Sequence, residues 1–163
     1  PGLDRGDAAC DLGSGNGFHS VEMAKTVAPS GRVIAVDIQP EMLKLLAERA
    51  QAAGVTNVQT LLGTATDPRL PAKTCDLILL SDVYHELDDP AAMLDHLERA
   101  LRPRGVIALL EFRAEDAKVP IKPEHKMSRK QILLELAANG FELVRSFDQL
   151  PWQHLMFFAP KRP

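Results

Sequence analysis

The stretch Asp11-Leu12-Gly13-Ser14-Gly15-Asn16-Gly17 joins a predicted strand over residues 8–12 to a predicted helix over residues 18–28. Its three glycines alternate with other residues and remove Cβ atoms where the chain turns sharply. Backbone N–H groups at the start of the helix can therefore approach a ligand closely. A strand, a glycine loop and a helix in this order predict an α/β fold that binds a ligand at the strand tips. A tight turn without a ligand is the alternative interpretation.

Short apolar runs and amphipathic helical patterns alternate along the rest of the chain, which predicts a parallel sheet with crossover helices. The run Leu77-Ile78-Leu79-Leu80 leaves no polar face, so its strand should lie at the centre of the sheet. We predict strands over residues 8–12, 32–37, 58–62, 76–83 and 106–112, and helices over 18–28, from Pro40 to before Gly54, from Pro90 to Leu101, and from the capping residue Ser128 to before Gly140.

The last two predicted strands, over residues 141–147 and 152–159, have no helix between them. Two strands joined by so few residues must pair in antiparallel fashion as a hairpin. The sheet is therefore mixed near one edge. A length of 163 residues suits one domain, so we expect residues 1–163 to form a single unit.

Composition excludes several classes of function. With 19 basic and 22 acidic residues the net charge is −3, which argues against general attraction to nucleic acid or to an anionic membrane. No apolar stretch approaches the ~20 residues that span a bilayer, and the first residues lack the layout of a signal peptide. We therefore expect a cytoplasmic location. Cys10 and Cys75 both lie in apolar runs, where we expect buried thiols and neither a disulfide nor metal ligands.

The spacing of the loop also distinguishes between cofactors. A dinucleotide-binding loop would place its third glycine at position 18, where this chain has Phe18, and this weakens the prediction of an NAD site. The carboxylate of Asp11 would repel a pyrophosphate and could hold an ammonium group instead. Asp37 ends the second predicted strand, where a carboxylate can accept hydrogen bonds from both hydroxyls of a ribose. A charge that favours the following helix start is the alternative for Asp37.

Three motifs, namely the loop 11–17, Val36-Asp37-Ile38 before Glu41-Met42-Leu43, and Leu101-Arg102-Pro103-Arg104-Gly105, resemble those of class I S-adenosylmethionine-dependent methyltransferases, particularly the small-molecule branch. The resemblance covers nearly the whole chain. It implies a three-layer, Rossmann-like α/β fold with a mixed sheet of seven strands, whose last strand is antiparallel beside the fifth. Helices usually precede this fold in the family, so we expect the chain to be truncated at its amino terminus.

The resemblance implies S-adenosylmethionine as the cofactor and assigns residues to each part of it. The methionine part falls to the loop, the ribose to Asp37 and the adenine to the residues after the second and third strands. The family often has Asp where this chain has Thr64, so the contact to the adenine amino group falls to the backbone or to Asp67. The cofactor-binding residues are Asp11, Gly13, Ser14, Gly15, Asn16, Gly17, Asp37, Ile38, Thr64 and Ala65, with Ser81 at the end of the fourth strand.

Methyl transfer from a sulfonium requires alignment of the nucleophile, the methyl group and the sulfur, and a base is optional. Candidates lie at the carboxyl ends of strands. We predict His85 as the base, Tyr84 as a positioning or cation–π group, and Glu111 as a residue that orients the substrate. Packing against the next helix is the alternative for Tyr84 and His85, and pairing with Arg113 is the alternative for Glu111.

The loop over residues 114–127 carries Lys118, Lys122, His125 and Lys126. It is interpreted either as a recognition element or partial lid for an anionic substrate, or as a solvated charged loop. His19 and His96 show no paired ligand spacing, so we predict no metal site.

We predict a methyltransferase that uses S-adenosylmethionine and a small-molecule acceptor, with no nucleic-acid or membrane partner. An NAD-type oxidoreductase and a non-catalytic S-adenosylmethionine-binding protein are the alternatives. The acceptor, the choice among O-, N- and C-methylation, the need for a base and the oligomeric state are left open by the sequence.

Overall fold

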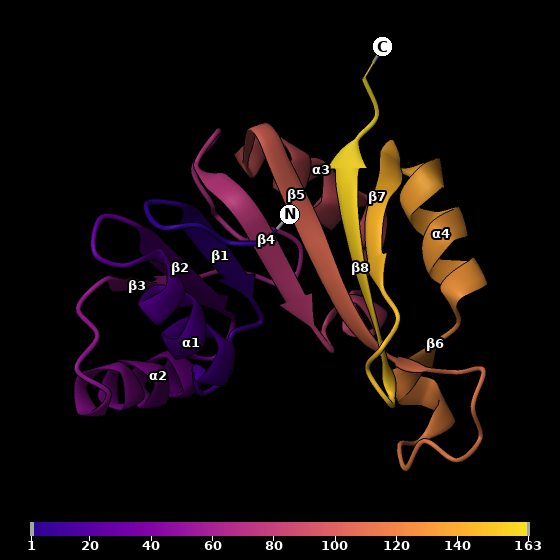
Figure 1. The fold of residues 1–163 in the computed structure, drawn as a ribbon, viewed down its shortest axis with the longest axis horizontal. Coiled ribbons are helices and arrows are strands. Elements are labelled where there is room, and N and C mark those ends of the chain that lie inside the picture. The colour runs from indigo at the N-terminus through magenta and orange to yellow at the C-terminus, as the bar shows by residue number, and fades with distance from the viewer. Residues whose placement is uncertain (1, 163) are drawn as a thin grey trace.

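A computed structural model describes residues 2–162. One mixed sheet runs through the molecule in the order β3-β2-β1-β4-β5-β8-β7, and a short β6 pairs with β5 (Figure 1). Its strands are β1 (Ala8–Leu12), β2 (Arg32–Asp37), β3 (Val58–Leu62), β4 (Cys75–Ser81), β5 (Leu101–Arg113), β6 (Lys126–Met127), β7 (Phe141–Phe147) and β8 (Gln153–Pro160). The helices are α1 (Phe18–Val27), α2 (Pro40–Ala52), α3 (Pro90–Ala100) and α4 (Arg129–Ala138).

The two faces of the sheet are covered by different helices. Ala9 and Val33 pack against α1 on one face, where Val27 is fully buried. The next residue of each strand, Cys10 and Ile34, belongs to the main core, which is shared with α3 and α4 on the opposite face. This alternation follows from the two-residue period of a strand. The predicted three-layer architecture is confirmed.

The strand order reverses at β1, which pairs in parallel with both β2 and β4. All five residues of β1 are buried. Crossover connections leave the sheet in opposite directions on either side of such a point, so a crevice opens at the carboxyl ends of β1 and β4. The glycine loop follows β1 at this crevice.

The terminal hairpin forms as predicted. β8 pairs in antiparallel fashion with β5 on one side and with β7 on the other, so the last strand lies beside the fifth. The expected seven strands are present, and β6 adds two residues that pair with Phe112 and Arg113 of β5. The mixed Rossmann-like sheet implied by the resemblance is therefore confirmed.

Two strand boundaries differ from the prediction by two residues or more, and the other differences are of one residue, at β4, β5 and β8. β4 ends at Ser81 and not at Val83, because Asp82 adopts a positive φ of 56° and turns the chain into a short 3₁₀ helix, η1 (Tyr84–Glu86). β5 starts directly after α3, at Leu101, five residues before the predicted start. The apolar pattern alone does not reveal either boundary, since both depend on backbone turns next to the sheet.

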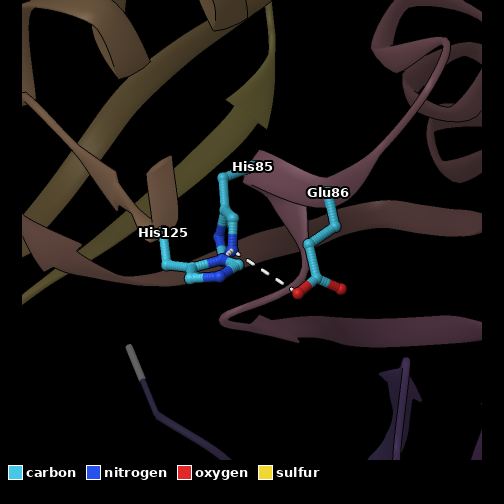
Figure 2. A group of neighbouring side chains, drawn as sticks. All are labelled: His85, Glu86 and His125. Atoms are coloured by element: carbon cyan, nitrogen blue, oxygen red, sulfur yellow. Dashed lines mark hydrogen bonds and ion pairs between the residues drawn. The ribbon is translucent and has the colours of Figure 1, made fainter. Parts of the chain in front are cut away.

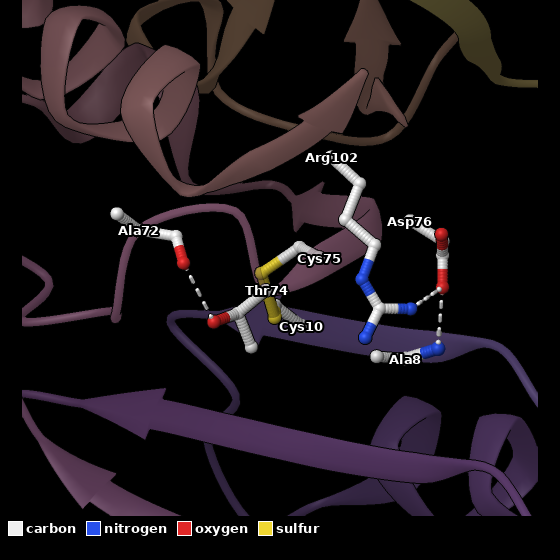
Figure 3. Close-up of a disulfide and its surroundings, with 7 residues drawn as sticks. All are labelled: Ala8, Cys10, Ala72, Thr74, Cys75, Asp76 and Arg102. Atoms are coloured by element: carbon white, nitrogen blue, oxygen red, sulfur yellow. Dashed lines mark hydrogen bonds and ion pairs between the residues drawn. A yellow bond between two sulfur atoms is a disulfide. The ribbon is translucent and has the colours of Figure 1, made fainter. Parts of the chain in front are cut away.

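The expectation of two free thiols is wrong. Cys10 and Cys75 are joined by a disulfide between β1 and β4 (Figure 3). Both side chains are fully buried. Their apolar sequence context predicted the burial correctly, but it carried no information that β1 and β4 are neighbours.

In the described part of the chain, no helix combines the length and the apolar character that crossing a membrane would require.

Candidate active site

The glycine loop is shaped by the packing around it. Gly13 has a φ of +68°, and a Cβ atom at this position would lie 2.5 Å from Cγ2 of Val83. Gly15 also has a positive φ, but no atom lies within 4 Å of the position that its Cβ would take. The first glycine is therefore required for close packing, whereas the second leaves open space above the backbone.

Asp37 holds the loop from the end of β2. One carboxylate oxygen accepts a hydrogen bond from the backbone N–H of Gly15 at 2.9 Å, and the other accepts from the N–H of Gln39 at 2.9 Å. A carboxylate has about four lone-pair positions, so two remain for other donors. Asp37 thus fixes the loop and can still accept hydrogen bonds from a bound diol.

A cavity of about 360 Å³ opens where these residues meet, within the usual size range of small-molecule sites. Six of the residues that the sequence assigned to the cofactor border it, and Ile38 presents an apolar side chain that is 55% exposed. The residues of the cavity are Leu12, Gly13, Gly15, Val36, Asp37, Ile38, Gln39, Met42, Thr64, Ala65, Val83, Glu86, Leu87, Asp88 and Met93. The open backbone at Gly15, the acceptor at Asp37 and the apolar wall fit a nucleoside with a charged tail.

Asp11 does not border this cavity. Its carboxylate is only 2% exposed and accepts a hydrogen bond from Oγ of Ser20 in α1 at 2.7 Å. Burial raises the pKa of Asp11 from 3.8 to about 6; the hydrogen bond from Ser20 opposes this rise, and the charge of Asp37 adds to it. The structure therefore places Asp11 behind the loop, as a buried support between β1 and α1.

The remaining expected cofactor residues lie around the loop without bordering the cavity. Oγ of Ser14 is buried and has no hydrogen-bond partner within residues 2–162. The backbone N–H of Gly17 donates to the carbonyl of Ser14 at 3.1 Å. Oγ of Ser81 lies 3.1 Å from Nε2 of His19, a residue that the sequence analysis did not assign to the site. Asn16 follows Gly15 in the same loop and is exposed.

His85 and Glu111 form a close pair at the ends of β4 and β5. Nδ1 of His85 lies 2.8 Å and 3.0 Å from the two carboxylate oxygens of Glu111, and the backbone N–H of His85 donates to the same carboxylate at 3.0 Å. Glu111 is fully buried, and this burial raises its pKa against the lowering effect of His85. The pair holds the imidazole in one orientation with Nε2 directed away from Glu111.

Tyr84 is packed in the core, which was the alternative considered for it, whereas Arg113 does not form the pair that was the alternative for Glu111. The ring of Tyr84 is buried in the main core, and its hydroxyl donates to Glu135 at 3.1 Å. Burial raises the pKa of Tyr84, and the carboxylate of Glu135 adds to the shift. Arg113 does not pair with Glu111 but donates to the backbone carbonyls of residues 148 and 150.

A second cavity, of about 480 Å³, lies on the other side of η1. His85 borders this second cavity, Glu86 borders the first, and Leu87 borders both. The residues that line the second cavity are Tyr84, His85, Leu87, Pro90, Ala114, Glu124, Lys126, Met127, Ser128, Gln131 and Glu135. The two cavities thus share Leu87 as a wall residue, and η1 contributes residues to both of them.

His125 also lies next to His85, although from the sequence it was only one member of a loop interpreted as a recognition element or partial lid, or as a solvated charged loop. It ends the 3₁₀ helix η2 (Pro123–His125), and its Nδ1 lies 3.3 Å from Nε2 of His85 (Figure 2). The only sequence signal was a histidine in a loop that follows the end of β5. The three-dimensional course of the loop is needed to bring it to His85.

Comparison with protein families gives a direct assignment. The profile of a family described as a methyltransferase domain matches residues 3–154. The chain belongs to this methyltransferase family. The recognition of a class I fold with S-adenosylmethionine as its cofactor is confirmed, and the cavity at Asp37 and Gly15 is where the observed geometry fits that cofactor.

Solved structures and curated relatives agree with this family. A S-adenosylmethionine-dependent methyltransferase from Aquifex aeolicus superposes with a TM-score of 0.90 at 28% identity, over 96% of this chain and 84% of that one. The ubiquinone/menaquinone biosynthesis C-methyltransferase UbiE of Enterobacter sp. is 32% identical over 112 residues, which are 68% of this chain and 45% of UbiE. A protein-L-isoaspartate O-methyltransferase of Ignicoccus hospitalis is 33% identical over 96 residues, 59% of this chain and 44% of the relative. The methyltransferase chain therefore spans less than half the length of these two curated relatives.

Proposed function

We propose that this methyltransferase transfers the methyl group of S-adenosylmethionine to a small molecule held in the second cavity. The arrangement around η1 carries the proposal, because His85 borders one cavity, Glu86 borders the other and Leu87 borders both. A displacement reaction between two bound molecules needs their reacting atoms close together and aligned. Two cavities of small-molecule size that share Leu87 and both take residues from η1 support this placement of the two molecules.

S-adenosylmethionine supplies, when bound, a methyl group that its sulfonium has already activated for transfer. In the proposal, Asp37 accepts hydrogen bonds from the ribose hydroxyls, and the glycine loop receives the methionine part along the open backbone of Gly15. Asp11 supports the loop from behind. The proposed binding residues are Gly13, Ser14, Gly15, Asn16, Gly17 and Asp37, with Ile38, Thr64 and Ala65 toward the adenine and Ser81 at the end of β4, and Asp11 acts through the loop that it supports.

His85 is the proposed base. With Nδ1 donating its hydrogen to Glu111, Nε2 has a lone pair that faces Nδ1 of His125 at 3.3 Å. An acceptor hydroxyl, amine or activated carbon that displaces this contact can give its proton to that lone pair. Glu111 then stabilises the imidazolium that forms, so it acts as a positioning residue. A base of this kind contributes about 10²- to 10⁴-fold in rate. Tyr84 shapes the acceptor cavity from its buried position, as a wall and not as a proton donor.

The acceptor class follows from the walls of the second cavity. Ser128 and Gln131 are polar, Glu124 and Glu135 add carboxylates beside Lys126, and Leu87 and Met127 are apolar. This mixture suits a small molecule with an apolar body and a polar group. By their names, one relative methylates a carbon in ubiquinone and menaquinone biosynthesis and the other an oxygen of protein L-isoaspartate, so neither the methylated atom nor the acceptor of this chain is taken from them. The single domain, the cytoplasmic location and the absence of nucleic-acid and membrane partners stay predictions from composition.

The test combines isotope-labelled S-adenosylmethionine with a panel of small phenols, quinols, amines and carboxylic acids, and follows the acceptor by mass spectrometry. We expect a labelled methyl group on at least one acceptor, and a His85→Ala rate lower by about 10²- to 10⁴-fold with unchanged affinity for S-adenosylhomocysteine. Binding without transfer to any acceptor, including the small molecules of a cell extract, would instead support a non-catalytic binding protein. Thermal stabilisation by NADH but not by S-adenosylhomocysteine would contradict both the methyltransferase and the non-catalytic S-adenosylmethionine-binding protein.

A further inference from the structure

Three potential ligand atoms lie together where η1 meets η2 (Figure 2). Nε2 of His85 lies 3.3 Å from Nδ1 of His125 and 3.6 Å from Oε1 of Glu86, and all three atoms lie within 4.8 Å of one another. We propose that His85, Glu86 and His125 bind one divalent transition-metal ion, with Zn²⁺ as the preferred ion. From the sequence we predicted no metal site, because His19 and His96 show no paired ligand spacing. His85 and His125 are 40 residues apart, and only the fold brings them together.

The distances between the ligand atoms favour a tetrahedral ion. Bonds of about 2.0–2.1 Å at tetrahedral angles separate neighbouring ligand atoms by roughly 3.3–3.4 Å. Octahedral bonds of the same length would bring neighbouring ligand atoms to roughly 2.9 Å. The observed 3.3 Å and 3.6 Å lie nearer the tetrahedral value. The third pair, His125 and Glu86, lies within 4.8 Å, so an ion among the three atoms requires these two side chains to move toward each other.

Glu111 provides the second independent feature of the site. Its buried carboxylate lies at 2.8 Å and 3.0 Å from Nδ1 of His85, on the side of the ring opposite the cluster. Ligand histidines commonly donate their other ring N–H to a carboxylate, which fixes the tautomer and makes the free nitrogen a better ligand. The same contact would be unnecessary for a solvated surface histidine.

Local charge also suits a cation. The carboxylates of Glu86 and Glu111 flank the two imidazoles, whereas the ammonium of the neighbouring Lys126 is turned away and donates to the backbone carbonyl of Asp116 at 3.3 Å. Binding a divalent ion here therefore pairs it with two carboxylates, one of them a ligand. Imidazole and carboxylate together are a usual donor set for zinc.

Three protein ligands leave the fourth position of a tetrahedral ion free, as in catalytic zinc sites. Since Glu86 and His125 are exposed, that position is accessible to water, and His85 brings the ion beside the second cavity. The ion would also connect η2 to η1 and fix the loop that carries Glu124 and Lys126. A metal on Nε2 of His85 would occupy the lone pair of the proposed base, so the loaded protein should transfer methyl groups more slowly. This last consequence depends on the proposed function, whereas metal binding does not.

The test measures binding directly, with neither cofactor nor acceptor present. The untagged chain is stripped with EDTA and titrated with Co²⁺, whose visible absorption reports the coordination geometry, and Zn²⁺ is then added as a competitor. We expect one Co²⁺ per chain with the intense bands of tetrahedral coordination, and complete displacement by Zn²⁺. The exposed position of His125 makes His125→Ala a variant that should fold, and we expect it to bind Co²⁺ at least tenfold more weakly.

Two further variants separate a metal site from a simple contact. Glu111→Gln should weaken Co²⁺ binding about 10- to 100-fold, because it removes the carboxylate behind a ligand. His96→Ala removes a partly exposed histidine outside the cluster and should bind Co²⁺ as the wild type does. Failure of the wild type to bind Co²⁺, or equal affinity in wild type and His125→Ala, overturns the proposal and leaves a histidine–histidine hydrogen bond. A separate titration with S-adenosylhomocysteine shows whether the cofactor site is intact in each case.

Discussion

The buried carboxylate of Asp11 should lower the stability of the folded chain at neutral pH. Burial raises its pKa from 3.8 to about 6, so the folded state holds this proton more tightly than the unfolded state does. The difference of 2.2 units corresponds to about 3 kcal/mol at 1.36 kcal/mol per unit. Above pH 6 both states are ionised, and the folded state carries the full cost. As the pH falls from 6 to 3.8, the folded state takes up the proton first and the cost disappears.

Asp11→Asn removes this titration while keeping an oxygen that can accept the hydrogen bond from Ser20. We therefore expect the variant to be more stable than the wild type by up to about 3 kcal/mol at pH 7–8, less any cost of burying the amide NH₂. The advantage should shrink between pH 6 and pH 4 and reach its minimum below pH 4. The shape of this curve is the decisive result, because a constant amide penalty shifts the whole curve without changing its slope.

Urea unfolding followed by circular dichroism, at several pH values between 4 and 8, measures the difference. Trp152 is half exposed, so its fluorescence is a poor reporter of unfolding. Ser20→Ala serves as the partner in a double-mutant cycle, since a hydrogen bond to a charged group contributes about 1.5–3 kcal/mol and a neutral one about 0.5–1.5 kcal/mol. Its effect at pH 7 should be larger in the wild type than in the Asp11→Asn background. A stability difference independent of pH would refute the reasoning.

The other predictions concern the cofactor, the disulfide and the proposed base. Asp37→Ala should weaken S-adenosylhomocysteine binding by about 3 kcal/mol or more, because it removes two hydrogen bonds to a charged group, and Asp37→Asn should weaken binding less. Calorimetry measures both affinities, and an unchanged affinity contradicts the ribose contact. The double variant Cys10→Ala, Cys75→Ala should unfold about 4 kcal/mol more easily, because the disulfide closes a loop with a sequence separation of 65. Urea unfolding measures this loss, and alkylation of both thiols in unreduced, denatured wild-type protein would show that the bond is absent. Glu111→Gln should lower kcat toward that of His85→Ala with little change in KM. If the two residues act together, the double variant should lose no more kcat than His85→Ala alone, whereas full activity of Glu111→Gln excludes a shared role.

The sequence predicted the order of the strands and helices because those signals are local. The strands over residues 8–12, 32–37 and 58–62 were predicted with the observed limits. Each is a run of five or six residues, mostly apolar or β-branched, between turn signals. Runs of this length suit a strand and are too short for a typical helix. The position of β8 between β5 and β7 could not come from local signals alone. The short hairpin loop indicated antiparallel pairing, and the resemblance to a known family supplied the insertion beside the fifth strand.

The pairs that form across the sheet were harder to predict. Cys10 and Cys75 were recognised as buried, but their bond depends on β1 and β4 being neighbours with their side chains on the same face. Asp11 was expected to face the ligand, since its place next to the glycine loop suggests that orientation. The structure turns its carboxylate toward Ser20 in the following helix, and the rotation of α1 that permits this contact is not encoded in any short motif. Contacts of this kind follow from packing, which sums many weak preferences over the whole chain.

The partner of Glu111 shows the same limit at the site itself. Side chains two residues apart on a strand point to the same face, which made Arg113 a reasonable partner for Glu111. Arg113 is the last residue of β5, however, and the carbonyls that follow β7 bind its guanidinium there. The turn at Asp82, with its positive φ, directs η1 back over the end of β5, so that both the backbone N–H and Nδ1 of His85 reach the buried carboxylate. A fully buried carboxylate requires such donors, and the backbone turn next to it determines which side chain supplies them.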